Sequence, residues 1–535
     1  MNMNIKTNRK IPLIVLMTII LIIFTRAITL THNMELHPDE HVFFNAAQSL
    51  KGYISGSSPI YEEVKEYPEG AIVLQLPFHI LSSIIYRITG TYIEPQVSGR
   101  IAAVFYFTIG FVFASAIIHQ FFSDQALSIV VYGLIMLFSV FHIEQSRYGT
   151  GDAISYFLIM LLIFSAGKSL TKENKSLLFL LLSTFSAGLV SAVKYPLCFF
   201  LLIPIFCAFY VLKYSSKAKK ILFPLAMCVV FYFGFAIISP KAALDPAYII
   251  RTSTRELDAY VGQLDTNLLE RIWSHFMSVF TYATLYSTFP LTTFFAAIEI
   301  TKRWKQCNCL SSVDILFSRF IPILTLAFLI YNLFVQLLVM RSLYPFFFVT
   351  DIYTAVIIGR WLSSFGKRRT TAIGLCAFLV LRGSVFIALM SEKNTDDRLK
   401  RMVLSAVDEN WHKTTFLSGF MILPSGYFYY ENVEMININD ERFDNSSSME
   451  LLPGELFING ARDWAIRPFL FNFLPWKQNE ERLSNVWVEF KSVNSQDYID
   501  AFYPEYIYYL FGFWIQGTTG TSHEFPTNFI YYRSQ

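Results

Sequence analysis

Charged side chains are scarce in this sequence: Asp, Glu, Lys and Arg make up 16% of its 535 residues, whereas a soluble domain carries nearer ~25%. The net charge is only +3, and no basic stripe typical of a nucleic-acid reader is present. The sequence also lacks a Gly-rich phosphate loop, a low-complexity segment and a solenoid repeat. These absences exclude a nucleic-acid partner and a repeat protein, and they give no sign of nucleotide binding.

A disulfide framework is absent as well, because the chain has only six cysteines in an unsuitable arrangement. Four lie inside apolar runs, and Cys307 and Cys309 lie in a short loop among Lys and Arg. A single C-x-C is weak evidence for a metal, so we interpret these residues as reduced thiols.

What the chain does contain is apolar and aromatic: 54% hydrophobic residues, with 53 Phe and 30 Tyr. Such a composition favours an α-helical polytopic membrane protein, in which each span needs ~20 apolar residues. The apolar run after Lys10 is long enough to span, and no small-residue cleavage site follows it, so we interpret it as a retained signal anchor. The sequence predicts about eleven transmembrane helices, at 11–31, 99–119, 125–142, 152–168, 176–193, 195–212, 221–239, 272–300, 313–340, 342–362 and 371–390.

A further apolar stretch, 71–88, contains Gln, Pro, His and Arg and could either span or lie along the interface. Basic residues favour the cytoplasmic side of a membrane. Lys6, Arg9 and Lys10 then place the N-terminus in the cytoplasm. The later basic clusters all fall on that side only if 71–88 does not cross, so we expect an interfacial or re-entrant helix there. The clusters are Lys168/Lys172/Lys175, Lys213/Lys217/Lys219/Lys220, Lys302/Arg303/Lys305 and Lys367/Arg368/Arg369.

This topology divides the chain into a transmembrane domain, 1–390, and an extracytoplasmic domain, 391–535. The loop 32–98, with its juxtamembrane helices, would be outside. The 391–535 region is polar and mixed, with a helix-like start and strand-like runs, and predicts a small α/β domain.

Carboxylates lie at the predicted outer edge of the membrane. Asp39 and Glu40 follow the first span within His-Pro-Asp-Glu-His, where Pro38 ends one helix and Asp39 could cap the next. An N-cap with a solvated Glu is therefore one interpretation, and a His/Asp/Glu metal cluster is another. Asp152, close to Arg147, begins a later span from the same side and could equally be a cap. Carboxylates gathered on one face can also serve proton abstraction or cation binding.

Cations occur on the same predicted side, against the usual charge bias. Lys194 precedes Tyr195 and Pro196 between two spans, and Arg341 lies at another span boundary. A snorkelling lysine is the simpler interpretation of Lys194. Its position outside favours a phosphate-binding role, because it offers compact charge next to lipid. Tyr67, just before the 71–88 helix, is a weaker candidate.

In order along the chain, these pieces resemble the polyprenyl-phosphate-sugar-dependent GT-C glycosyltransferases, which include protein O-mannosyltransferases and lipid A aminoarabinose transferases. The resemblance covers roughly 10–390. It is carried by PDE at 38–40, EYPEGAIVLQLPFHILSSIIYRITG at 66–90, GRIAAVFYF at 99–107, SRYGTGDAISYFLIM at 146–160, KYPLCFFLLIP at 194–204 and RSLYPFFFVTDIYTA at 341–355. The 391–535 region carries no motif that maps, and His41 has no counterpart.

The resemblance implies an inverting transfer of a sugar from a polyprenyl-phosphate donor to an acceptor hydroxyl on the outer face. Asp39, Glu40 and Asp152 would act on the acceptor and sugar, and Lys194 and Arg341 would bind the lipid phosphate. Arg147, Tyr67 and Tyr195 would be further substrate-binding residues. No cofactor is expected, with a divalent metal left open. The acceptor would be an envelope glycan, lipid A or a protein, at a bacterial inner membrane with the C-terminal domain in the periplasm.

Three other functions remain open. A transporter or lipid flippase would place ionisable residues near the bilayer midplane on broken, repeated helices, whereas these spans look nearly free of charge. A non-catalytic scaffold would bind a partner through its outer domain. A polymerase or ligase would use a diphosphate-linked glycan, which the sequence hardly distinguishes from a monophosphate donor.

Overall fold

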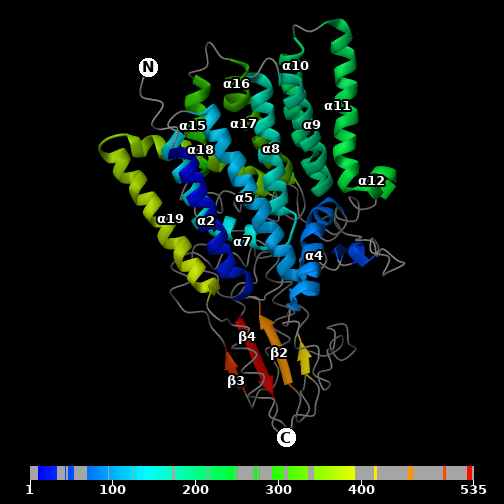
Figure 1. Cartoon of the computed structure of the whole chain (residues 1–535). Coiled ribbons are helices and arrows are strands. Elements are labelled where there is room, and N and C mark those ends of the chain that lie inside the picture. Colours follow the sequence, from blue (N-terminus) through cyan, green and yellow to red (C-terminus); the bar gives the residue numbers. More distant parts are fainter. Residues whose placement is uncertain are drawn as a thin grey trace. The chain divides into compact units, whose positions relative to one another are not determined.

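The computed structural model is mostly helical (Figure 1). It describes residues 10–32, 69–93, 95–122, 125–171, 175–213, 216–245, 292–305, 311–334 and 343–391, single positions within 43–52 and 247–276, and four strands beyond residue 414. Contacts divide the chain into two compact units, one of Met1–Thr31 with Asp39–Ala388 and one of His32–Pro38 with Leu389–Gln535.

The helical unit contains helices over the predicted apolar runs, together with shorter elements that the runs did not predict. They are α2 (Lys10–His32), α4 (Glu69–Thr89), α5 (Pro95–Phe121), α6 (Gln125–Phe138), α7 (Val140–Arg147), α8 (Asp152–Thr171), α9 (Ser176–Val193), the 3₁₀ helix η2 (Tyr195–Leu201), α10 (Leu202–Val211), α11 (Lys217–Ile238), α12 (Pro240–Leu244), α15 (Thr292–Lys305), α16 (Ser312–Ile315), the π turn η4 (Leu316–Phe320), α17 (Ile321–Phe334), α18 (Tyr344–Ser363) and α19 (Lys367–Ser391). Within the described residues, eight helices are long and apolar enough to cross a membrane, so the prediction of apolar membrane-length helices is confirmed.

Two predicted spans look different in the structure. The 125–142 stretch is broken at Ser139, whose extended backbone separates α6 from the short α7. Most of 272–300 lies outside the described residues, where only α15 and single positions are placed. The other predicted spans each overlap a helix.

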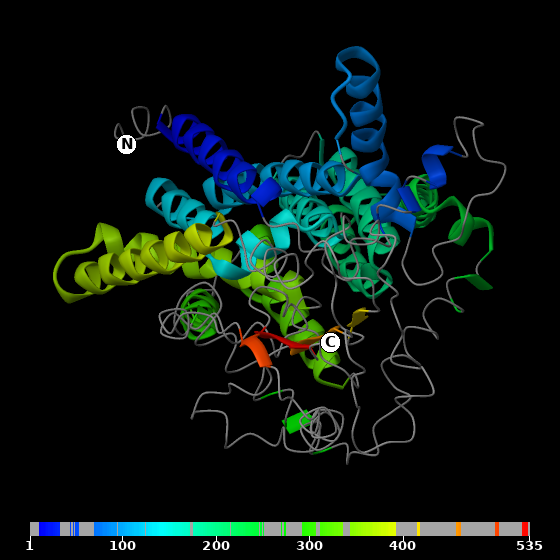
Figure 2. The ribbon, with the colours of Figure 1, turned by 90° about the horizontal axis from the view of Figure 1, so that it is seen from below.

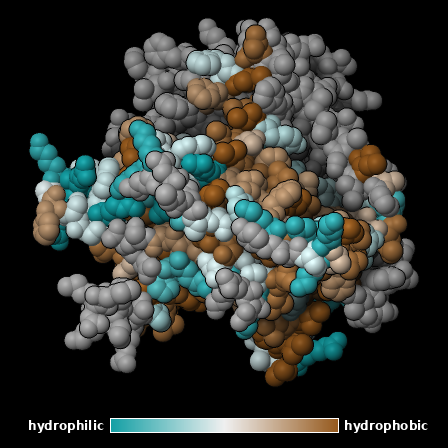
Figure 3. Space-filling model, turned by 90° about the horizontal axis from the view of Figure 1, so that it is seen from above, coloured by the Kyte–Doolittle hydropathy of each residue, from teal (hydrophilic) through white to brown (hydrophobic). Residues whose placement is uncertain are grey.

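The basic clusters gather at one end of the helical unit. The ends of α5, α8, α15 and α18 meet there: Gly167 packs on Phe121, the Arg303 guanidinium lies 4.2 Å from the Phe122 ring centre, and Arg360 bonds Glu299 at 2.7 Å. Figure 3 looks down on this end and shows hydrophilic side chains spread among apolar ones. The common sidedness that charge counting predicts is thus present in the packing. We refer to the end of the helical unit where α5, α8, α15 and α18 meet as the basic end.

Helix α4 does not run through the bundle to the basic end, although its length and composition would allow it to cross a membrane. Its first turn packs at Ala192, near the end of α9, and its Ser82 hydroxyl lies 2.6 Å from that of Ser98 in the first turn of α5. The first turn of α4 and Ser82 in its second half therefore both lie at the end opposite the basic clusters. Its second half is mostly exposed and projects from the other helices in Figure 2. This geometry agrees with the predicted non-crossing helix.

Glycines allow α9 and α11 to pack closely. A Cβ at Gly188 would lie 2.2 Å from the Phe231 carbonyl oxygen, and one at Gly234 would lie 2.4 Å from that of Phe185. Because both oxygens belong to the backbone, the helices would have to separate to admit a side chain.

Gly188→Ala is therefore expected to destabilise the protein by about 1–3 kcal/mol, the usual cost of overpacking. The measurement is thermal unfolding in detergent. Gly374→Ala on α19 is the matched control, because among the described residues no atom outside the adjoining backbone of its own helix lies within 4 Å of its added Cβ. Equal unfolding temperatures for the two variants would contradict the close α9–α11 contact.

The second unit contains a four-stranded mixed sheet of order β1-β2-β4-β3. Strand β1 (Thr415–Leu417) pairs parallel with β2 (Leu456–Ala461), which pairs antiparallel with β4 (Thr527–Tyr532), and β3 (Tyr498–Ala501) pairs antiparallel with β4. The predicted helix-like start at 396–411 and the strand-like runs at 433–439 and 486–493 lie outside the described residues.

Candidate functional site

Asp152 and Lys194 form an ion pair at the end opposite the basic clusters. The Lys194 ammonium donates to Asp152 Oδ1, and the Thr150 hydroxyl donates to Asp152 Oδ2 at 2.9 Å. The carboxylate is almost entirely buried, with 2% of its side chain exposed, whereas the lysine side chain is 29% exposed. The pair thus has a buried anionic side and a cationic side that reaches the surface.

Local helix geometry explains why these two residues meet. Asp152 is the first residue of α8, where the helix dipole favours a carboxylate, and Lys194 follows the last residue of α9, where it favours a cation. Lys194 has extended backbone, and Pro196 lies in the first turn of the 3₁₀ helix that begins at Tyr195, so the chain turns at this point. Lys194 therefore has a carboxylate partner in the fold, 42 positions away in the sequence.

A second buried carboxylate, Glu69, lies beside this pair. Its Oε2 accepts from the Ser239 hydroxyl at 3.3 Å and from the Lys241 backbone N–H at 3.1 Å, which ties α4 to the end of α11. Gly151, adjacent to Asp152, lies against Ala71 of the same first turn of α4. The first turns of α4 and α8 and the ends of α9 and α11 therefore form one polar cluster, which we call the carboxylate end.

Sequence reasoning missed Glu69, because a glutamate before an apolar helix looks like an ordinary first-turn residue. The available signal was its place in EYPEG, two residues after the candidate Tyr67, at the start of the one helix that charge counting kept on this side.

Several predicted site residues cannot be placed in this cluster. Asp39, Glu40, Tyr67 and Arg341 lie outside the described residues. Arg147 is the last residue of α7, and its side chain is not described. The Tyr195 ring lies 6.3 Å from that of Phe235, so its position next to Lys194 is fixed by packing between η2 and α11. Their roles stay predictions.

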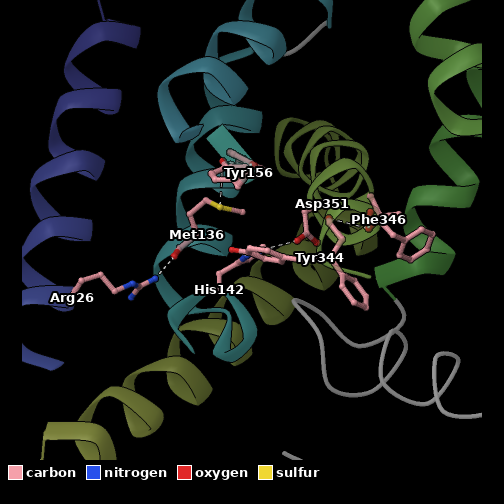
Figure 4. Close-up of polar contacts among 10 residues, drawn as sticks. Arg26, Met136, His142, Tyr156, Tyr344, Phe346 and Asp351 are labelled. Carbon is pink, nitrogen blue, oxygen red and sulfur yellow. Dashed lines mark hydrogen bonds and ion pairs between the residues drawn. The ribbon is translucent and has the colours of Figure 1, made fainter. Parts of the chain in front are cut away.

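A second polar cluster is buried between α7 and α18 (Figure 4). His142 Nε2 lies 2.7 Å from Asp351 Oδ2, and His142 Nδ1 lies 3.3 Å from the Tyr344 hydroxyl. The His142 and Asp351 side chains are 0% and 1% exposed. Tyr132 and Tyr156 share a further hydrogen bond of 2.8 Å nearby. The sequence suggested that the spans are nearly free of charge. The structure instead buries ionisable groups among them.

Arg26 of the first helix is also fully buried, and it stabilises the break between α6 and α7 (Figure 4). Its guanidinium donates to the carbonyls of Met136 and Leu137, at 2.6 and 3.3 Å, and to the Ser146 hydroxyl at 2.6 Å. These carbonyls end α6 and have no helical partner of their own. The arginine thereby fixes α7, and with it His142, against the first helix.

No three His, Cys, Asp or Glu side chains lie close enough to hold a metal ion in the part of the chain that the structure describes. The His37–His41 segment, for which a metal cluster was an alternative interpretation, lies outside that part. The four described cysteines are free thiols.

No protein-family model and no curated protein matches this chain. A search of solved structures does find matches. ArnT from Cupriavidus metallidurans bound to undecaprenyl phosphate shares 8% identity and a TM-score of 0.49, over 96% of this chain and 97% of that one. An Archaeoglobus fulgidus oligosaccharyltransferase in complex with Zn and sulfate shares 11% identity and a TM-score of 0.47, over 76% of this chain.

This chain covers 60% of that oligosaccharyltransferase, less than two thirds of its length. The apo structure of the same ArnT matches at 10% identity and a TM-score of 0.46, over 79% of this chain and 85% of that one. Such low identities single out no site residue, and the TM-scores indicate only a loose likeness.

Proposed function

We propose that this protein is a membrane glycosyltransferase that moves a sugar from a polyprenyl-phosphate donor to an acceptor hydroxyl. The observation that carries the proposal is the Asp152–Lys194 pair, with Glu69 beside it, at the end opposite the basic clusters. A buried carboxylate and a partly exposed cation offer the two charges that such a transfer requires. The ordered motifs that resemble the GT-C family support the same reaction class.

In the proposed reaction the acceptor oxygen attacks the anomeric carbon and forms the new glycosidic bond. The bond from that carbon to the phosphate oxygen breaks, and the lipid phosphate leaves with the electron pair. Asp39 takes the proton of the acceptor hydroxyl, and Glu40 positions that acceptor. Attack opposite the leaving group inverts the anomeric centre.

The remaining residues stabilise charge and bind substrate. Lys194 and Arg341 neutralise the departing phosphate, an electrostatic role that is strongest where water is excluded. Asp152 holds the lysine and, as its motif predicts, binds a sugar or acceptor hydroxyl. Arg147, Tyr67 and Tyr195 line the substrate. The sugar arrives activated by its lipid phosphate, so the proposal needs no nucleotide and no cofactor.

The proposed topology has about eleven spans, with the N-terminus in the cytoplasm and the carboxylate end outside, at a bacterial inner membrane. The C-terminal domain would be extracytoplasmic. The acceptor would be an envelope glycan, a lipid such as lipid A, or a protein.

One specific observation favours a second candidate, a transporter or flippase of lipid-linked sugars. The buried His142–Asp351 pair places ionisable groups inside the helical unit, where transporters carry theirs. This pair lies close to the carboxylate end, because Tyr156, one turn after Asp152, packs on Phe348, one turn after Tyr344, with ring centres 4.3 Å apart. We therefore favour the enzyme.

Donor competition tests the proposed reaction class. Purified protein is incubated with a labelled acceptor extract and equal amounts of undecaprenyl-phosphate sugar, undecaprenyl-diphosphate sugar or nucleotide sugar. The expected result is transfer from the monophosphate donor alone. Preferred use of the diphosphate donor would instead indicate the polymerase or ligase class.

A further inference from the structure

The His142–Asp351–Tyr344 cluster lies next to the proposed site, and neither the sequence motifs nor the proposed reaction gives His142 or Asp351 a role. Its three side chains come from two helices that are far apart in the sequence. Burying such groups is expensive unless they are paired, and buried ionisable residues in spans usually serve a function.

Chemistry fixes which atom donates and which accepts in each hydrogen bond of the cluster. A carboxylate only accepts, so the proton on the short contact to Asp351 belongs to His142 Nε2. In a neutral imidazole Nδ1 is then the acceptor, and the Tyr344 hydroxyl donates to it. Asp351 thereby fixes the histidine tautomer, and the histidine fixes the orientation of the tyrosine hydroxyl.

The cluster contains a hydrogen-bond acceptor that its internal bonds do not use. Asp351 Oδ1 is buried and has no hydrogen-bond partner among the described residues. Ring packing holds the imidazole in place: Phe348 stacks on it at 6.2 Å, and Phe141 and Phe107 lie near its other sides. The histidine therefore has little freedom to reorient. Figure 4 shows His142 beside Asp351 and Tyr344.

Tyr344 connects this cluster to the carboxylate end. It is the first residue of α18, three positions after the predicted phosphate ligand Arg341. The start of α18 packs against the start of α8, where Asp152 lies, through the Tyr156–Phe348 contact. A shift of the Tyr344 side chain would consequently move the first turn of α18 relative to the site.

We propose that His142 and Asp351 are positioning residues: by holding Tyr344 they fix the first turn of α18 against the start of α8, where the phosphate of the lipid donor binds. This inference rests on the proposed function. It assigns no proton transfer to the pair, since both side chains are buried away from the reacting atoms. Their removal should weaken donor binding and leave the chemical step nearly unchanged.

A double-mutant cycle tests the proposal, with His142→Gln, Tyr344→Phe and the combination of both. The readouts are the Kd for undecaprenyl phosphate alone and the kcat and donor KM of transfer. Each single variant should raise the Kd and the KM by about 10-fold, the equivalent of about 1.4 kcal/mol, with kcat within about twofold. The combination should be no worse than either single variant, because both act through one hydroxyl.

Asp351→Asn retains an oxygen acceptor for His142 Nε2 and should keep most of the binding, whereas Asp351→Leu should lose it. Thr350→Val is the matched control, since the Thr350 hydroxyl bonds only carbonyls of its own helix. Additive effects in the cycle, or a loss of kcat at unchanged KM, would overturn the positioning role. Failure of the wild-type protein to bind undecaprenyl phosphate would instead overturn the proposed function, and this inference with it.

Discussion

Asp39→Asn is expected to lower the rate of sugar transfer by about 10²–10⁴-fold, the usual contribution of a positioned general base. An amide cannot take the proton of the acceptor hydroxyl, so the chemical step slows while substrate binding is retained. The measurement is single-turnover transfer with donor and acceptor at saturation, together with membrane yield and unfolding temperature to confirm intact insertion.

Asp245→Asn is a suitable control for this variant. Asp245 follows α12, close to the Glu69 contact at Lys241, and its side chain accepts a bond from the Ala247 N–H, two positions along the chain, at 3.1 Å. Its amide should leave transfer unchanged. Turnover at the wild-type rate in Asp39→Asn would remove this residue from the mechanism, even if the rest of the site stands.

Lys194→Ala is expected to have two separate effects, on stability and on donor use. Removing the ammonium leaves the Asp152 carboxylate buried without its charge partner, which costs about 3–5 kcal/mol for a buried pair. The partial exposure of Lys194 places this variant at the lower end of that range. Loss of a charge that stabilises the leaving phosphate should also reduce transfer by about 10²–10³-fold.

A compensating variant separates the two effects. Asp152→Asn combined with Lys194→Met removes both charges and keeps the apolar stem, so stability should recover toward that of the wild type. Transfer should remain low, because the Lys194 cation no longer meets the phosphate. Recovery of donor use along with stability would show that Lys194 acts only as the partner of Asp152. Unfolding in detergent and donor titration provide the two readouts.

Much of the helical unit could be predicted from the sequence, because span placement depends on local apolar runs. Charge counting added information that hydropathy alone lacks. It kept 71–88 at one end, and the contacts of α4 with Ala192 and Ser98 agree. The carboxylate end follows from the same count, since Asp152 and Lys194 each begin or end a helix on one side.

The partnerships within the site could not be predicted, because they depend on which helices become neighbours. Asp152 and Lys194 are 42 positions apart, and His142 and Asp351 are 209 apart. Both of the latter lie in apolar runs, where a single polar residue is usually a satisfied core side chain. Glu69 was missed for the opposite reason, since a glutamate at a helix start has an ordinary local explanation.

Product analysis in proteoliposomes tests the central claim most directly. Purified protein is supplied with a labelled undecaprenyl-phosphate sugar and an acceptor extract, and the lipid and glycan products are identified by mass spectrometry and NMR. We predict one free undecaprenyl phosphate for every sugar joined to an acceptor, with inverted anomeric configuration. Movement of the labelled sugar between leaflets while it stays attached to its lipid, without any acceptor product, would contradict the account and indicate a flippase.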